Sequence, residues 1–260
     1  MASSRGFTDR IPSLLLDDGR TLMDMGEYTQ AGETFEKAIA TGGGSAPDLL
    51  VERARLRMRL GDFEGATAAL DQASTSAGVI EAALAPRLEA TRAEVAYSQG
   101  RVKEARAAFE RASKLWTGPL PDAASVEARA FLGFLDGLDG RAQGRQAVIE
   151  SMEQAARMQR PAVEAVIRVL LARLELHARR PAQALAALDG LPLAPLSPEL
   201  QAQVLYWRAE ARDAQSPDSG EGDRREAHQA IERAGQGVPT ELRERYFSRP
   251  DLRAMSSVNR

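Results

Sequence analysis

The sequence predicts an all-α fold in which about six helix-turn-helix repeats stack into an α-solenoid. Two observations predict it: a spacing of glycine, aromatic and alanine residues that recurs along the 260 residues, and a small residue seven positions before each expected turn. A third observation, proline near the expected start of several helices, places the boundaries of the repeats. Because each repeat packs only on its neighbours, we expect one elongated body and not two compact domains.

The spacing G-x-Y-x-x-A-x-x-x-F-x-x-A is clearest in the segment that begins at Gly26. Residues three and four apart lie on one face of a helix, so Ala31, Phe35 and Ala38 form a single stripe. Alanine lets the preceding helix approach, and the aromatic ring fills the space beside it. Two further good copies begin at Gly61 and Gly100, and three degraded copies begin at Gly140, Arg179 and Gly222.

A small residue stands where the two helices of each unit must come close together. It lies seven positions before the turn in the first five units, and in the sixth unit the segment 216–222 is inserted between it and the turn. These six residues are Gly19, Ala54, Ala93, Gly133, Ala172 and Ala209.

Helix starts follow from proline, which lacks an N–H and is tolerated in the first turn of a helix. The clearest start is Ser197-Pro198-Glu199, where a capping hydroxyl precedes proline and an acid faces the positive end of the helix dipole. A second helix follows each turn. The first helices of the six units are expected to begin near Ile11, Pro47, Ala82, Asp122, Pro161 and Pro198.

This pattern resembles the tetratricopeptide repeat family, whose units place glycine in the turn and alanine where two helices nearly touch. Successive turns lie about 35 to 43 residues apart, against about 34 in that family and about 40 to 47 in armadillo-type arrays. The period alone does not separate the two families, but the glycine-aromatic-alanine spacing favours the tetratricopeptide repeat. The resemblance implies a concave groove, lined by first helices, that binds a partner.

The ends of the chain depart from the repeat pattern. We expect residues 1–10 to be a flexible N-terminus, residues 11–237 to form the array, and residues 238–260 to form a C-terminal capping helix and tail. Leu242, Tyr246 and Phe247 are expected to cover the apolar face of the last unit, because solenoid ends need a cap. The tail also resembles those that end helical-repeat regions in large bacterial signalling and regulatory proteins.

Composition excludes several classes of function. A net charge of −3 argues against a nucleic-acid-binding domain, which usually carries a basic stripe. The first ten residues lack the apolar stretch of a signal peptide and no run is long enough to span a bilayer, so we expect a cytoplasmic protein. There is no cysteine, and the two histidines, His177 and His228, belong to no zinc pattern. We therefore expect no catalytic residues, no metal and no cofactor.

The family resemblance implies which first-helix positions face the groove: those six and three residues before each turn, with their neighbours. Apolar members in the middle of the chain would receive a partner helix or peptide, and arginines toward the ends would grip carboxylates. Two alternatives stay open: Phe134 belongs to the core, and the arginines pair with acids on their own helices. The predicted partner-binding residues are Arg20, Arg55, Arg59, Glu94, Tyr97, Phe134, Leu138, Arg173, Leu176 and His177.

Four alternating arginines on one expected helix split into two stripes, Arg53 with Arg57 and Arg55 with Arg59. Arg53 is matched by Arg92 and Arg208 at the equivalent position of other units. This recurrence indicates a structural arginine and not a nucleic-acid contact.

Together these features predict a non-catalytic scaffold or regulatory module that binds a partner protein or peptide in its groove, in bacterial signalling. The alternative is a sensory domain that encloses a small effector or signalling peptide. A third possibility is self-association through an uncapped end of the array.

Overall fold

The computed structural model describes residues 11–43, 47–76, 84–116 and 122–256, and its described part is helical throughout, with no strand. The expected N-terminus 1–10, the expected helix start at Ala82 and the last four residues of the tail lie outside the described residues. The first helices of the six units are α2 (Ile11–Met25), α4 (Pro47–Arg59), α6 (Leu84–Ser98), α8 (Ala123–Leu138), α10 (Pro161–His177) and α12 (Pro198–Asp213).

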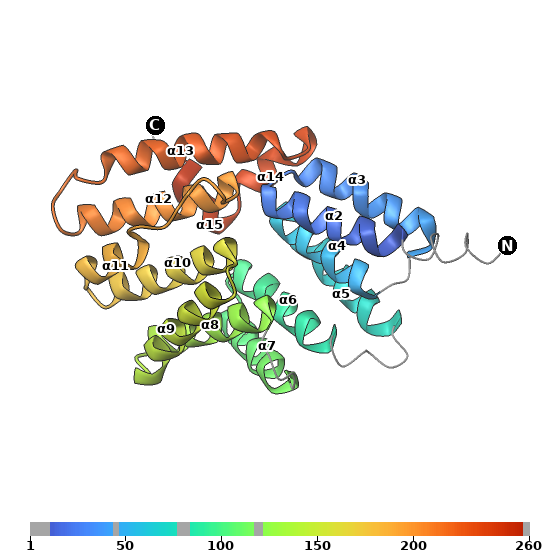
Figure 1. The fold of residues 1–260 in the computed structure, drawn as a ribbon, viewed down its shortest axis with the longest axis horizontal. Coiled ribbons are helices and arrows are strands. Elements are labelled where there is room, and N and C mark those ends of the chain that lie inside the picture. Colours follow the sequence, from blue (N-terminus) through green and yellow to red (C-terminus); the bar gives the residue numbers. More distant parts are fainter. Residues whose placement is uncertain (1–10, 44–46, 77–83, 117–121, 257–260) are drawn as a thin grey trace.

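The second helices return antiparallel to the first. They are α3 (Tyr28–Ala38, extended by the π-helical turn η1, Ile39–Gly43), α5 (Phe63–Ser76), α7 (Val102–Leu115), α9 (Ala142–Arg157), α11 (Pro181–Leu188) and α13 (Glu221–Gln236). The 3₁₀ turn η2 (Thr240–Leu242) and two short helices, α14 (Arg243–Phe247) and α15 (Pro250–Ser256), end the described chain. The α-solenoid of about six helix-turn-helix repeats is confirmed (Figure 1).

Five turns share one hydrogen-bond pattern, which explains the glycine in the repeat. At the first, Gly26 N–H donates to the carbonyl of Met23 at 3.0 Å and Glu27 N–H donates to that of Leu22 at 2.9 Å. This is the Schellman motif, and it needs a left-handed residue, which Gly26 supplies with φ +83°. Gly61, Gly100 and Gly140 repeat it, and Arg179 adopts the same left-handed conformation with φ +59°.

The sixth turn differs from the sequence-based expectation. Gly222 lies inside α13, one residue after its start, and the left-handed residue before this helix is Asp218, with φ +64°. The Asp213 carboxylate accepts a hydrogen bond of 2.6 Å from Gly220 N–H and so holds the connecting segment. The insertion therefore forms a turn of its own before the helix, which moves the turn away from Gly222. The predicted stripe Ala227, Ile231 and Ala234 is nevertheless buried.

Small residues allow the close helix contacts that the spacing predicted. A Cβ atom on Gly19 would lie 2.2 Å from the Phe35 ring, so only glycine fits beneath that side chain. Ala54, Ala93, Ala172 and Ala209 are fully buried at the equivalent positions. The structural arginines also pair as expected: Arg53 with Glu36, Arg92 with Asp71, and Arg208 with Asp223, each joining a first helix to a second helix.

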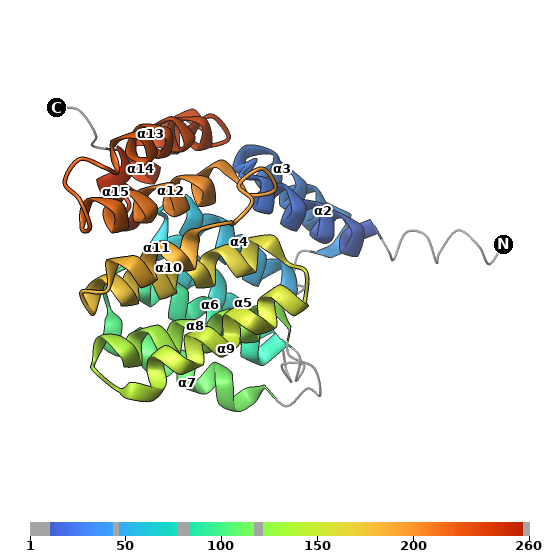
Figure 2. The same cartoon turned by 60° about the vertical axis from the view of Figure 1, so that its left-hand side comes forward.

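The most consequential feature of the fold is that the first unit packs against the last. Figures 1 and 2 show α13 and α14 beside α3, so the array closes into a ring. Thr29 N–H donates a 2.9 Å hydrogen bond to the carbonyl of Gly237, about two hundred residues along the chain. One apolar cluster joins the two ends, with buried members that include Tyr28, Phe35, Ile231, Tyr246 and Leu252.

A buried carboxylate stands at this junction. Glu199, in the first turn of α12, accepts hydrogen bonds from the hydroxyls of Tyr28 at 2.9 Å and Tyr246 at 2.8 Å. Arg249 binds both of its oxygens, at 3.0 and 3.2 Å, and Arg59 binds one at 3.2 Å. We call these five residues the Glu199 cluster. It ties α3, α4, α12 and the C-terminal segment together.

Burial alone would raise the pKa of Glu199, but the charges of Arg249 and Arg59 and the hydrogen bonds from Arg249 and Tyr246 lower it to about 2. Glu199 is therefore ionised in the folded protein at neutral pH. Burial and the charge of Glu199 raise the pKa of both tyrosine hydroxyls, so these keep their protons and remain donors.

The C-terminal segment contacts both ends of the array, whereas the sequence suggested that it covers the last unit alone. Phe247 lies over Gly235 of α13, where a Cβ would meet its ring at 2.4 Å. Tyr246, in contrast, stacks near Tyr28 of the first unit, with ring centroids 6.1 Å apart. Arg249 donates a 2.6 Å hydrogen bond to the carbonyl of Arg59. Two short helices thus stand where a single capping helix was expected.

None of the described helices is both long and apolar enough to cross a lipid bilayer.

Removing the charge of Glu199 should weaken the junction that closes the ring. Glu199→Gln leaves the nearly buried Arg249 with Asp251 as its remaining counterion and leaves Arg59 with no ion pair to a described residue, so we expect the free energy of unfolding to fall by about 3 kcal/mol or more. Urea denaturation followed by circular dichroism measures this loss. The matched control is Glu210→Gln, whose partly exposed pair with Arg224 should contribute no more than about 1 kcal/mol. Equal losses in the two variants would contradict a special role for Glu199.

The same residue should make stability depend on acid pH. The folded pKa of about 2 lies below the ordinary 4.5, so its stabilisation is complete above pH 4.5 and is lost as pH falls toward 2. We expect the stability difference between wild type and Glu199→Gln to shrink by about 1–2 kcal/mol from pH 6 to pH 3.5. Urea denaturation at both pH values checks this. A constant difference would show that the Glu199 pKa is not lowered by folding.

Candidate functional site: the central cavity

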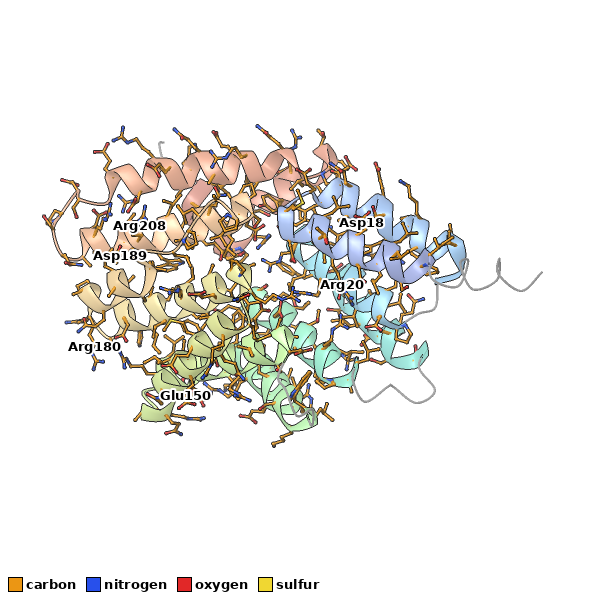
Figure 3. The ribbon with its side chains drawn as sticks, in the orientation of Figure 1. Asp18, Arg20, Glu150, Arg180, Asp189 and Arg208 are labelled. Atoms are coloured by element: carbon orange, nitrogen blue, oxygen red, sulfur yellow. The ribbon has the colours of Figure 1, made fainter. Side chains whose placement is uncertain are left out.

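A cavity of about 660 Å³ lies inside the ring and is lined by the first helices of all six units. This volume is within the range of about 300–1,000 Å³ typical of ligand pockets. Figure 3 shows side chains converging on the middle of the ring, with Arg20 on the inner side and Glu150 and Arg180 at the periphery. We call this space the central cavity. It is polar at one side and apolar where α8, α10 and α12 contribute Ala123, Val163, Val166 and Leu200.

Charged groups in the described lining comprise seven carboxylates and five arginines. Several neutralise one another. The buried Glu52 carboxylate binds Arg20 at 2.9 Å and Arg87 at 2.5 Å, and Arg87 also binds Asp48. Burial opposes ionisation of Glu52, but the arginine charges outweigh it and lower its pKa. Arg20 pairs additionally with Asp17 at 3.0 Å. These pairs hold α2, α4 and α6 together along one wall.

Two other lining carboxylates, Glu199 and Asp122, already accept hydrogen bonds from the protein. Glu199 belongs to the cluster that closes the ring, and through Arg59 that cluster reaches the cavity wall. Asp122 caps α8, where its side chain accepts a 2.8 Å hydrogen bond from Ser125 N–H. Their charges serve the fold and are not free for a ligand.

Three lining carboxylates have no hydrogen bond or ion pair to any described residue: Asp24, Glu94 and Glu127. Burial raises the pKa of Glu127 to about 7, and the negative charge of Glu94 adds to the effect. Burial also raises the pKa of Asp24. Arg55 stands among these groups, with Glu52 as its hydrogen-bond partner at 3.5 Å, and their negative charge raises its pKa. Perturbed acids of this kind mark candidate functional sites.

Four of the predicted groove residues line the central cavity: Arg20, Arg55, Arg59 and Glu94. The structure brings them together from the first three units. Arg20 and Arg59 are engaged in ion pairs, as the alternative of paired arginines proposed, although the partners lie on other helices as well as their own.

A second group of predicted residues gathers outside that cavity, around Arg173. Its guanidinium lies 4.8 Å from the Phe134 ring centre and 5.2 Å from that of Trp207, and it donates a 2.8 Å hydrogen bond to the Tyr97 hydroxyl. The expectation that Phe134 faces a partner is wrong, because its side chain is 1 % exposed and Arg173 covers it. The core alternative holds for this residue. Tyr97 keeps a half-buried position.

The remaining predicted residues are dispersed. Leu138 and Leu176 are half-buried and pack against the main apolar cluster, and His177 is exposed at the end of α10. None of the three is among the described residues that line the cavity.

A family model described as tetratricopeptide repeat matches residues 19–40. This span contains the Gly19–Phe35 contact and the Gly26 Schellman turn, and four other units repeat the hydrogen-bond pattern of that turn. Residues 19–40 thus resemble a tetratricopeptide repeat, and the described chain has a tetratricopeptide-repeat-like α-solenoid fold. Members of this family are generally scaffolds for protein interaction.

Two solved structures are similar to this chain over nearly their whole length. The C-terminal part of a TPR repeat-containing protein from Cytophaga hutchinsonii is 14 % identical, over 94 % of this chain and 96 % of that one, with a TM-score of 0.40. BtubC from P. vanneervenii is 17 % identical, over 88 % and 90 % of the two chains, with a TM-score of 0.49. No curated protein matches the chain.

The prediction from sequence missed most of the lining residues, because the first helices run obliquely to the cavity. In the first two units the lining residues of the first helices lie two to ten positions before the turn, as for Arg55 and Glu52. In the fourth unit Glu127 lies thirteen positions before it. The available signal was the shared face of Glu52 and Arg55, three residues apart. Arg87, thirteen positions before its turn, was missed for the same reason, and Arg160 was missed because it precedes the first helix of its unit.

Glu127 should make the protein less stable as the pH rises through neutrality. Its folded pKa of about 7 exceeds the ordinary 4.5, so the folded state binds the extra proton between these values and loses stability as pH increases. Relative to wild type, Glu127→Gln should be about 1–2 kcal/mol more stable at pH 8 and equal at pH 5, after allowance for solvent screening. Urea denaturation at both pH values measures this. Glu153→Gln, at an exposed site on α9, should show no pH-dependent difference, and a flat result for Glu127→Gln would refute the assignment.

Proposed function

We propose that this chain is a non-catalytic binding module that holds a peptide segment of a partner protein in its central cavity. The observation that carries the proposal is the 660 Å³ cavity, to which the first helices of all six units contribute. Closure of the ring holds those helices in place before a ligand arrives, and a preorganised site loses less ordering free energy on binding. The resemblance to the tetratricopeptide repeat family supports a protein partner.

A binding role, and not catalysis, fits the chemistry of the lining. The described lining consists of carboxylates, arginines and small apolar residues, and contains no histidine or nucleophile-base pair. We further propose a cytoplasmic, bacterial signalling context, supported by the composition and by the resemblance of residues 238–260 to tails of large bacterial signalling proteins.

A second candidate is the sensory domain that encloses a small effector. Ring closure favours it, because a cavity lined by the first helices of all six units is better suited to a small ligand than an open groove. A small effector would raise the melting temperature by mass action.

Blocking the cavity should abolish peptide binding. Gln203 lines it from α12 and makes no hydrogen bond to a described residue, so Gln203→Trp fills space without breaking a contact. Peptides are first selected from a random heptapeptide phage library on the wild-type protein, and their dissociation constants are then measured by fluorescence anisotropy. We expect Gln203→Trp to weaken binding at least tenfold, and Gln72→Trp, on the exposed face of α5, to leave it unchanged. Equal binding by both variants, or failure to select any peptide, would refute the proposal.

A further inference from the structure

The unpaired charges of the central cavity indicate the chemistry of its ligand. Within the described residues, the arginines of the lining are largely engaged: Arg20 and Arg87 bind Glu52, and Arg59 binds Glu199. Arg55 makes one long contact with Glu52, and Arg160, which has no ion pair to a described residue, acts electrostatically on Asp24. The acids Glu94 and Glu127, from α6 and α8, have no such partner, and the lining as a whole holds more acids than bases.

Two neighbouring acids, Glu94 and Glu127, cost folding free energy because their negative charges repel each other. A single substitution could avoid this cost. A neutral residue at either position would remove this repulsion, which adds to burial in raising the pKa of Glu127. An uncompensated acid facing a cavity is instead what recognition of a positive ligand group requires, because the ligand then supplies the missing counterion.

The form of that positive group follows from the surrounding residues. Among the described residues, no three acidic or histidine side chains lie close enough together to hold a metal ion. Beside Glu127, the first turn of α8 presents Ala123 and Ala124, and α10 adds Ala162 and Val166. This arrangement offers acids for a charged head and apolar surface for a methylene stem, as a lysine or arginine side chain needs.

We propose that the central cavity recognises a partner peptide through a lysine or arginine side chain, whose charge is received by Glu94 and Glu127 and whose stem packs on Ala123 and Val166. The proposal rests on the proposed function and names its ligand chemistry. Arg55, Arg59 and Asp24 face the same two acids from α4 and α2 and complete the electrostatic surroundings. Raising the salt concentration should therefore weaken binding.

The peptides selected on the wild-type protein test this inference. We expect one position to be enriched in lysine and arginine relative to the library, and replacement of that residue by norleucine to weaken binding at least tenfold. Norleucine keeps the apolar stem and removes the charge. Selected peptides that lose binding to Gln203→Trp are thereby shown to bind in the cavity. If these peptides carry no position enriched in lysine or arginine, this inference is overturned and the proposed function remains intact.

A double-mutant cycle tests whether Glu94 and Glu127 are the acids that receive the positive charge of the peptide. In Glu94→Gln/Glu127→Gln, the lysine and norleucine peptides should bind equally, whereas Glu153→Gln should keep the full difference. If the double variant does not fold, Glu94→Gln alone should reduce the difference by at least threefold. A difference that survives in a folded variant would overturn the assignment of Glu94 and Glu127.

Two further measurements complete the test. Binding of the lysine peptide should strengthen several-fold from pH 6 to pH 8, as Glu127 ionises among Glu94, Asp24, Arg55 and Arg59, and binding of the norleucine peptide should not. Spermidine and L-argininamide, offered as free amines, should compete at least a hundredfold more weakly than the peptide. If the free amines compete as well as the peptide does, the ligand of the cavity is a small amine and the proposal of a peptide side chain is overturned.

Discussion

The structure depends on one buried carboxylate. Glu199 would be costly to bury alone, but two tyrosine hydroxyls and two guanidinium groups surround it, and they come from the first unit, the second unit and the C-terminal segment. Removing a partner from a buried charge is strongly destabilising. The two units and the C-terminal segment must therefore pack in the one arrangement that supplies all four partners of Glu199. That arrangement fixes the ring, and the ring fixes the position of every first helix around the cavity.

The repeat could be predicted from sequence because its causes are local. A Schellman turn needs a left-handed residue, and the close contact beneath Phe35 needs glycine at position 19; both requirements act within one unit. Closure could not be predicted, because it results from small rotations between units that accumulate over the whole array. Glu199 illustrates the difference: its first-turn position predicted a dipole contact, while its buried partners lie in segments distant in sequence.

In the candidate site, too, features that depend on one unit could be predicted from the sequence, and features that depend on how the units are arranged could not. Position relative to the turn placed Arg20, Arg55, Arg59 and Glu94 at the cavity, since the first three units present the same side of their helices to it. It failed for Phe134 and Arg173, because the later helices cross the ring obliquely and turn those positions toward one another. A periodic rule holds only while successive units keep the same inclination.

Closure of the ring also changes how the repeat array can gain or lose units. In an open array each unit interacts only with its neighbours, so units can be gained or lost at the ends with modest effect, and the termini fray first. Here the bond between Thr29 and Gly237 makes the first and last units neighbours. A ring of this geometry accommodates a set number of units, so duplication or deletion of a single unit, the usual route by which repeat arrays diversify, would break the circle.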